Sequence, residues 1–459
     1  MSIAGSGETR PGSLRASAGA LLVRLQGLLA SDDHHTVAQR QAGMAFVIRV
    51  VAAGFVFVSQ IVLARWMGRF EFGIYVYVWT WLVLLGGLMP LGISIAAQRF
   101  IPEYTKRGDP DRLRGFLAGS RWLCFGLGTA GALVGVALIW LLQNQLAPYY
   151  ILPFALACAC LPAYATSDCQ DGIARSYNWI DLAIGPVFLA RPLLVLGIMA
   201  LVFATGWPVN ANAAMAATTI AIWATCAIQF LLLERRLRSK VERGPRHYEP
   251  GVWLKTGLPI FMVESFYFLL TYTDILVLEL YAGPGEVAVY YAATKTLALV
   301  AFVYYAVSAA TAHRFAEYHV AGDREKLEAF LAGAIRWTFW PSLVATIGLL
   351  ALGKFVLQLF GPGFDQGYPL LFVLSVGLLA RAAIGPVERL LMMVGEQRVC
   401  ALAYGLAFIL NLLLCTLLIP RFGGLGAAMS TATALIVETI LLFFATRRRL
   451  GLHVFIWRR

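Results

Sequence analysis

The sequence predicts an all-α polytopic membrane protein with about twelve transmembrane helices in two parallel-repeat six-helix bundles. Of 459 residues, 59% are hydrophobic and only 14% are charged, whereas soluble domains carry about 25% charged residues. The apolar residues form long runs without the two-residue alternation of a transmembrane β-barrel. Because a crossing needs about 20 apolar residues and must pair its own backbone, each run is expected to be a helix. A repeat within the chain, described below, divides these helices into two sets.

Twelve runs are long enough to cross a bilayer. They span residues 43–64, 72–95, 116–142, 150–168, 179–204, 212–233, 254–280, 286–312, 330–352, 367–386, 399–419 and 424–445. Pro153 and Pro162 interrupt the fourth run. Gly185-Pro186 lies in the fifth, where we expect a kinked helix with carbonyls that need new partners.

Both ends of the chain are expected to be cytoplasmic. Residues 1–42 are predicted to hold an amphipathic helix on the membrane surface, because their leucines recur at helical spacing. Asp32-Asp33-His34-His35 is interpreted as a solvated linker, since four consecutive residues rarely converge on one metal ion. With this orientation, 27 of the 37 Lys and Arg residues lie in inner segments and only 4 in outer loops, as the positive-inside rule requires. The location is therefore predicted to be the cell inner membrane.

A repeat joins the two halves of the sequence. Ala97-Gln98-Arg99-Phe100 recurs as Ala312-His313-Arg314-Phe315, and the same offset of 215 carries Gly68 onto Gly283. Six runs lie between the copies, so both halves cross the bilayer in the same direction. The predicted domains are a cytoplasmic segment, a first bundle, a charged linker, a second bundle and a basic tail. Their respective ranges are 1–42, 43–234, 235–252, 253–446 and 447–459.

Several short segments carry a resemblance to a known family. The first half contains Gln60-Ile-Val-Leu-Ala-Arg-Trp-Met-Gly68, Phe72-Gly-Ile-Tyr75 and Arg99-Phe-Ile-Pro-Glu-Tyr104, and the second contains Gly285-Glu-Val-Ala-Val-Tyr-Tyr-Ala-Ala293. Over about residues 40–446 the chain resembles the polysaccharide or O-antigen lipid-linked oligosaccharide flippases of the multidrug/oligosaccharidyl-lipid/polysaccharide exporter (MOP) superfamily. The resemblance implies two bundles in a V around a central cavity. It also implies alternating access and export of an undecaprenyl-pyrophosphate-linked glycan to the outer leaflet.

Two charged residues occupy equivalent places in the first helix of each bundle. Arg49 lies about six residues, or ~9 Å, into its helix, and the repeat places Glu264 at the equivalent point of the seventh helix. We expect Arg49 to face the cavity and contact the substrate diphosphate, because a guanidinium fork suits phosphate. Glu264 would be its resting counter-charge. The alternative is that Arg49 extends to the inner interface.

The four other candidate site residues are also ionisable and lie within predicted spans, where each needs a partner or a water-filled cavity. Lys295 and Asp274 are predicted to pair across adjacent helices and to separate when an anion arrives, or to be a purely structural ion pair. Arg191, beside Pro192, is predicted to bind substrate in the cavity. Glu438 is the candidate for ion coupling.

The remaining patterns narrow the function. There is no nucleotide-binding glycine loop, zinc-binding helix or nucleophile elbow, and the seven cysteines lack a metal-ligand spacing. No enzyme activity, metal or other cofactor is therefore expected. The expected partners are the lipid-linked oligosaccharide, the bilayer and, as candidates, polysaccharide assembly enzymes, without nucleic acid. The alternatives are a cation-coupled multidrug exporter of the same superfamily and a membrane glycan polymerase or ligase.

Overall fold

The computed structural model describes the backbone of residues 34–457 and the side chains of residues 52–457, apart from those at 263, 309, 312 and 313. The chain forms two compact units, Met1–Gly54 and Phe55–Arg459, and each is considered by itself. The side chains of residues 1–51 are not described. The predicted surface helix within residues 1–42 and the acidic and histidine cluster at 32–35 therefore stay predictions.

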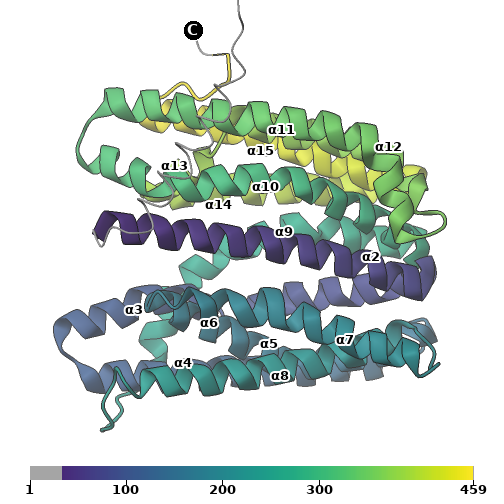
Figure 1. Cartoon of the computed structure of the whole chain (residues 1–459), viewed down its shortest axis with the longest axis horizontal. Helices are drawn as coiled ribbons and strands as arrows, with labels where there is room; N and C mark the ends of the chain where they lie inside the picture. Colours follow the sequence, from purple (N-terminus) through teal and green to yellow (C-terminus); the bar gives the residue numbers. More distant parts are fainter. Residues whose placement is uncertain (1–33, 458–459) are drawn as a thin grey trace, which may run out of the picture. The chain divides into compact units, whose positions relative to one another are not determined.

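All regular secondary structure in residues 34–457 is helical, which confirms the predicted fold class (Figure 1). The elements are α2 (His34–Leu88), α3 (Ile93–Arg107), α4 (Pro110–Leu142), α5 (Pro148–Ser176), α6 (Ile180–Ile184), the π-helix η1 (Gly185–Ala190), α7 (Arg191–Ala204), α8 (Ala211–Leu237), α9 (Pro250–Ala282), α10 (Pro284–Val320), α11 (Arg324–Phe360), the 3₁₀-helix η2 (Phe364–Gly367), α12 (Tyr368–Ile384), α13 (Val387–Met393), α14 (Gln397–Phe422) and α15 (Gly424–Leu450). We call α2–α8 the N-terminal half and α9–α15 the C-terminal half.

Eleven helical segments among the described residues are long and apolar enough to cross a membrane, one fewer than the sequence predicts. The difference arises in the first segment, Ala52–Arg107, which has 56 residues. A straight helix of that length would reach ~84 Å, far more than the ~30 Å hydrocarbon core. Gly68 leaves the helical conformation with φ 76° and ψ 171°, so the segment turns there and holds two of the predicted crossings.

The internal repeat is visible in the backbone. Gly283, the equivalent of Gly68, has nearly the same conformation, with φ 78° and ψ 174°. Three residues after each glycine comes a glutamate that accepts a hydrogen bond from the N-terminus of the last helix in its half. Glu71 accepts from Ala211 N at 2.8 Å, and Glu286 accepts from Gly424 N at 3.0 Å. Because helix N-termini carry unpaired N–H groups and a partial positive charge, both carboxylates stabilise the start of a long helix.

The two copies differ at one bend. Between α2 and α3 the chain turns at Pro90-Leu91-Gly92, where Leu91 and Gly92 both have positive φ. The equivalent residues in the C-terminal half are Tyr305-Ala306-Val307, and α10 runs through them without a break. Proline and glycine favour the turn and the second copy has neither, so the sequence difference accounts for the structural one.

The kink expected in the fifth span is present. Its helix is divided into α6, η1 and α7, and Gly185-Pro186 begins the π-helical part. Pro186 has no N–H to donate, and a π-helical turn is a common way of accommodating such a defect. Arg191 is the first residue of α7, directly after this segment.

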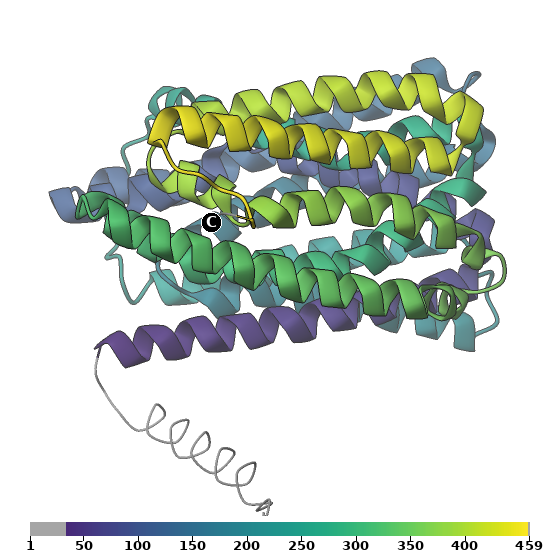
Figure 2. The same ribbon diagram turned by 90° about the horizontal axis from the view of Figure 1, so that it is seen from above.

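Within Phe55–Arg459 the helices run roughly along one common direction (Figure 2). One apolar cluster of the N-terminal half is built around Phe116, Ile173 and Leu233, and it includes Trp253 from the first turn of α9. Ile335, Leu390 and Leu442 belong to the cluster of the C-terminal half. In a third cluster, residues of both halves pack together.

The third cluster lies at the predicted outer end and continues into polar contacts that we call the outer latch. Arg69 donates to Gly285 O and to Gln366 Oε1, both at 2.9 Å. The hydroxyl of Tyr150 on α5 donates to Glu279 on α9. These contacts connect the two halves at the outer end.

Gly73→Ala is expected to destabilise this closed outer end. A Cβ at this position would overlap the carbonyl oxygen of Pro284 in the other half, and overpacking typically costs about 1–3 kcal/mol. The thermal unfolding midpoint of the purified chain should therefore fall. Gly126→Ala is the matched control, because a Cβ there meets nothing within 4 Å and alanine favours the helix. Equal midpoints for the two variants would contradict the closed outer latch.

Candidate functional site

Lys295 and Asp274 lie close enough to interact electrostatically but do not form the predicted ion pair. The Asp274 carboxylate is buried and accepts hydrogen bonds from the hydroxyls of Tyr290 at 2.5 Å and Thr431 at 3.0 Å. Lys295 instead places its Nζ 4.8 Å from the centre of the Tyr291 ring. Both oxygens of the Asp274 carboxylate already accept hydrogen bonds, Oδ2 from these two hydroxyls on α10 and α15 and Oδ1 from Ile275 N at 2.8 Å, so the carboxylate is satisfied without the lysine.

Arg191 is a buried cation that, like the partly exposed Lys295, forms no ion pair among the described residues. Its side chain is 6% exposed, and its guanidinium lies over the Tyr164 ring at 5.1 Å. Nε has no hydrogen-bond partner. Asp168 is an electrostatic neighbour but lies beyond ion-pair distance. A cation–π contact with a desolvated cation contributes about 2 kcal/mol, which leaves part of the cost of burying this charge uncompensated.

Several tyrosines lie near Arg191 and Lys295 and near one another. Tyr272 on α9 lies close enough to Tyr164 and Tyr291 to interact with both electrostatically. Tyr164 is the ring that contacts Arg191, and Tyr291 is the ring that contacts Lys295. Tyr305 is also a neighbour of Tyr272 and of Lys295. Phenol hydroxyls donate and accept hydrogen bonds. Arg191 and Lys295 therefore have tyrosine neighbours from both halves, Tyr164, Tyr272, Tyr291 and Tyr305, which we call the tyrosine-rich region.

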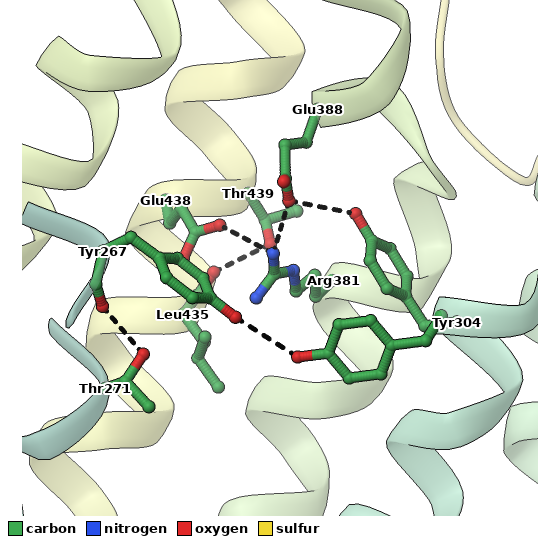
Figure 3. A network of polar contacts seen from close by, with 9 residues as sticks. Tyr267, Thr271, Tyr304, Arg381, Glu388, Leu435, Glu438 and Thr439 are labelled. Carbon is green, nitrogen blue, oxygen red and sulfur yellow. Dashed lines mark hydrogen bonds and ion pairs between the residues drawn. The ribbon is translucent and has the colours of Figure 1, made fainter. Parts of the chain in front are cut away.

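A separate charged cluster lies inside the C-terminal half (Figure 3). Arg381 on α12 forms an ion pair with Glu388 on α13 at 2.7 Å and a longer one with Glu438 on α15 at 3.7 Å. The guanidinium also stacks on Tyr304 at 4.9 Å. Glu438 is fully buried, and neither of its oxygens has a hydrogen-bond partner among the described residues. We call these four residues the Arg381 cluster.

Local backbone geometry explains how this cluster forms. Helix α12 ends at Ile384, and Gly385 adopts φ 62° before Pro386. This break turns α13 back, so that Glu388 meets an arginine only seven residues earlier. A continuous helix would place residues seven apart two turns, or ~10 Å, from each other along its axis.

The Arg381 cluster borders a small cavity of about 140 Å³. Its lining is rich in tyrosine and nearly balanced in charge, and it includes Glu264. The lining residues are Glu264, Tyr267, Tyr304, Tyr305, Ser308, Arg381, Glu388, Arg389, Met392 and Tyr404. This volume is several times the ~30 Å³ share of one water molecule, enough for a small ionic group but not for a whole glycolipid.

The structure therefore distributes five of the six predicted site residues over distinct places. Lys295 and Asp274 are neighbours without an ion pair, and Arg191 stacks on Tyr164. Glu264 lines the cavity beside the Arg381 cluster, and Glu438 is a member of that cluster. The Arg49 side chain lies outside the described residues, so its predicted contact with phosphate and with Glu264 stays a prediction.

Sequence reasoning missed three members of the Arg381 cluster, namely Arg381, Glu388 and Tyr304. Arg381 was visible as a basic residue in a predicted span, but no spacing connects it to Glu438, 57 residues later on another helix. Glu388 lay in a predicted inner loop, and only the return of the chain after Gly385-Pro386 brings it back. The Gly-Pro pair was the one local signal of that return.

The helix arrangement of this chain is shared by membrane transporters of known structure. The structure of an inward-facing MATE-family multidrug resistance transporter has a TM-score of 0.71 at 16% identity, over 87% of this chain and 93% of that chain. A structure of the lipid II flippase MurJ in an inward closed conformation has a TM-score of 0.66 at 15% identity, over 88% and 87% of the two chains. Identities this low show the shared fold alone.

Sequence families make the assignment more specific. Residues 39–319 match the family "Polysaccharide biosynthesis protein", and residues 184–458 match the family "Lipid II flippase MurJ". Each match covers more than half of the chain, and the chain belongs to this group of polysaccharide-biosynthesis and lipid-flippase families. A probable low-salt glycan biosynthesis flippase, Agl15 of Haloferax volcanii, is 22% identical over 172 residues, and the match spans 37% of this chain and 36% of that relative.

Proposed function

We propose that this protein is a flippase for a lipid-linked oligosaccharide used in polysaccharide biosynthesis. The glycan is carried on a lipid diphosphate of the undecaprenyl type and moves from the inner to the outer leaflet. The protein acts as a transporter without catalytic chemistry of its own. This proposal is supported by the matched families, which are named for lipid II flipping and polysaccharide biosynthesis, and by the relative Agl15, which is named a probable glycan biosynthesis flippase.

One observation about this chain supports an anionic, diphosphate-containing substrate. Among the described residues, Arg191 and Lys295 have no carboxylate within ion-pair distance. A cation in a membrane protein that lacks a fixed counter-charge is costly, and a diphosphate entering between the halves would supply the missing negative charge. Arg191 presents the guanidinium fork that binds phosphate oxygens in pairs. We assign Arg191 and Lys295, together with Arg49 of α2, to the diphosphate.

The proposed mechanism is alternating access between the two halves, with 43–234 and 253–446 as the moving parts. The outer latch holds their outer ends together in this conformation, which favours loading from the predicted cytoplasmic side. The tyrosine-rich region offers hydroxyls and ring faces to sugars. Glu438 is proposed as the ion-coupling residue, because its buried carboxylate has only a long ion pair with Arg381 and accepts no hydrogen bond among the described residues, so it can take up a proton or a cation.

The protein is proposed to lie in the cell inner membrane with both termini in the cytoplasm, where polysaccharide assembly enzymes are its candidate partners. The distribution of Lys and Arg supports this orientation. A cationic drug as substrate has less support. The cavity beside the Arg381 cluster carries Glu264 and Glu388 but also Arg381 and Arg389, so its charge is balanced rather than acidic.

The test is leaflet accessibility of the lipid-linked glycan. Spheroplasts with and without this chain would be treated with periodate, which does not cross the membrane and oxidises sugar diols in the outer leaflet. We expect the oxidised fraction of lipid-linked glycan to fall sharply without the chain and to return when it is supplied again. An unchanged fraction, with altered efflux of a cationic dye instead, would favour the drug exporter and reject the flippase.

A further inference from the structure

A basic pocket lies at the predicted cytoplasmic end of the N-terminal half, remote in the sequence from the cations assigned to the substrate. It has a volume of about 590 Å³ and lies between α4, α8 and the linker that follows α8. Five arginines and two glutamates line it, so the lining carries net positive charge. The charged lining residues are Arg114, Arg121, Glu234, Arg238, Glu242, Arg243 and Arg246.

The inner wall of this pocket is built by fixed contacts. Arg121 is buried and pairs with Glu234 at 3.2 Å. Arg114 donates to the carbonyls of Pro245 at 2.8 Å and Glu242 at 3.1 Å and also pairs with Asp111. These bonds hold the linker backbone against α4, so the pocket is a formed feature of the fold.

The outer wall of the pocket contains arginines with few or no ion-pair partners. Arg243 and Arg246 are exposed on the linker and form no ion pair among the described residues. Arg238 has only a long contact to Glu234, at 3.8 Å. An anion in the pocket would meet several guanidinium groups whose donors are unused, and guanidinium is the side-chain group best suited to phosphate.

The surroundings of the pocket indicate where such an anion comes from. Immediately below it, α4 and α8 expose large apolar side chains of the kind that face lipid: Trp122 is 72% exposed and Leu231 66% exposed. Arg121 itself lies over the ring of Phe230 at 4.9 Å. Guanidinium groups directly above a lipid-facing apolar surface are at the level of lipid headgroups.

We propose that this pocket binds the phosphate of an anionic phospholipid headgroup, whose acyl chains lie along α4 and α8. The linker connects the two halves, so the bound lipid would hold the connection in place. The site is separate from the proposed glycolipid path and does not depend on the proposed function.

The repeat provides a contrast within the same molecule. With the offset of 214 that carries Phe116 onto Phe330, the equivalent of Arg114 is Glu328. Among the described residues, the charged lining of the equivalent pocket in the C-terminal half is Glu325, Glu328 and Arg336.

The test uses the purified full chain in detergent. Dioctanoyl phosphatidylglycerol, dioctanoyl phosphatidylcholine and inorganic phosphate would each be titrated while the thermal unfolding midpoint is followed, because a ligand of the folded state raises it. We expect phosphatidylglycerol to raise the midpoint, with little effect of the zwitterionic lipid or of phosphate. In R243Q/R246Q the concentration needed should rise about tenfold or more, since each arginine near anionic lipid contributes ~1 kcal/mol.

R447Q/R448Q is the matched control, because it removes two exposed arginines from the same predicted face at the end of α15. Its response to phosphatidylglycerol should equal that of the unmodified chain. R243Q and R246Q singly provide milder variants should the double change impair folding. Equal responses to the two lipids, an equal response to inorganic phosphate, or an equal loss in both double variants would overturn the proposal.

Discussion

Arg191→Gln is expected to lower glycolipid flipping by about 10- to 100-fold while leaving the protein at least as stable. The loss of transport follows from the proposed diphosphate contact, since hydrogen bonds to charged groups contribute about 1.5–3 kcal/mol. Initial rates of periodate accessibility at several glycolipid concentrations would measure it in proteoliposomes. The expected change is a higher concentration for half-maximal rate.

Replacing an ordinary buried arginine lowers the free energy of unfolding, whereas replacing Arg191 is expected to leave it level or raise it. Burying the charge within a membrane span costs at least ~2.5–3.5 kcal/mol, whereas its contact with Tyr164 returns about 2 kcal/mol. Because Arg191 has no ion pair in the described structure, the free energy regained by removing its buried charge exceeds the free energy lost with its contact to Tyr164. The unfolding midpoint of Arg191→Gln should therefore stay level or rise.

The conservative variant and a surface control complete this test. Arg191→Lys keeps the charge but loses the planar fork, so its rate should lie between those of Arg191→Gln and the unmodified chain. Arg99→Gln removes a side chain that is 67% exposed and should flip normally. Normal flipping by Arg191→Gln, or a large fall in its unfolding midpoint, would show that the residue has a structural role instead.

The fold could be predicted from the sequence because its determinants are local. Runs of apolar residues define the helices, Gly68 and Gly283 define equivalent turns, and Gly185-Pro186 defines the kink before Arg191. Each signal lies within a few residues of the feature that it produces. The repeat then extends this local information from one half to the other.

The charged contacts could be predicted only in part, because they depend on which faces of distant helices meet. Asp274 and Lys295 are close, as expected, but hydroxyls of Tyr290 and Thr431 occupy the aspartate. A hydroxyl has no signature in a hydropathy pattern, so the competition is invisible in the sequence. Arg381 and Glu438 meet through the packing of α12 on α15, which no spacing along the chain specifies.

Arg381→Met is expected to destabilise the protein by about 3–5 kcal/mol, the usual cost of removing one partner of a buried ion pair. The change would leave Glu438, fully buried, without a counter-charge, and Glu388 with a long contact to Tyr304 at 3.5 Å. A lower unfolding midpoint in detergent would measure the effect. This outcome is the reverse of that for Arg191→Gln, although both substitutions remove an arginine from a predicted transmembrane helix.

A double-mutant cycle separates the charge from the packing. Glu438→Gln keeps the shape of the side chain and removes its charge, so R381M/E438Q should recover at least half of the stability lost in Arg381→Met. Recovery would establish that the uncompensated carboxylate, rather than the lost side-chain volume, causes the loss of stability.

Glu438→Gln alone also tests ion coupling, because flipping in proteoliposomes should then lose its response to an imposed proton gradient. A retained response would remove Glu438 from the coupling path and leave it as the structural counter-charge of Arg381.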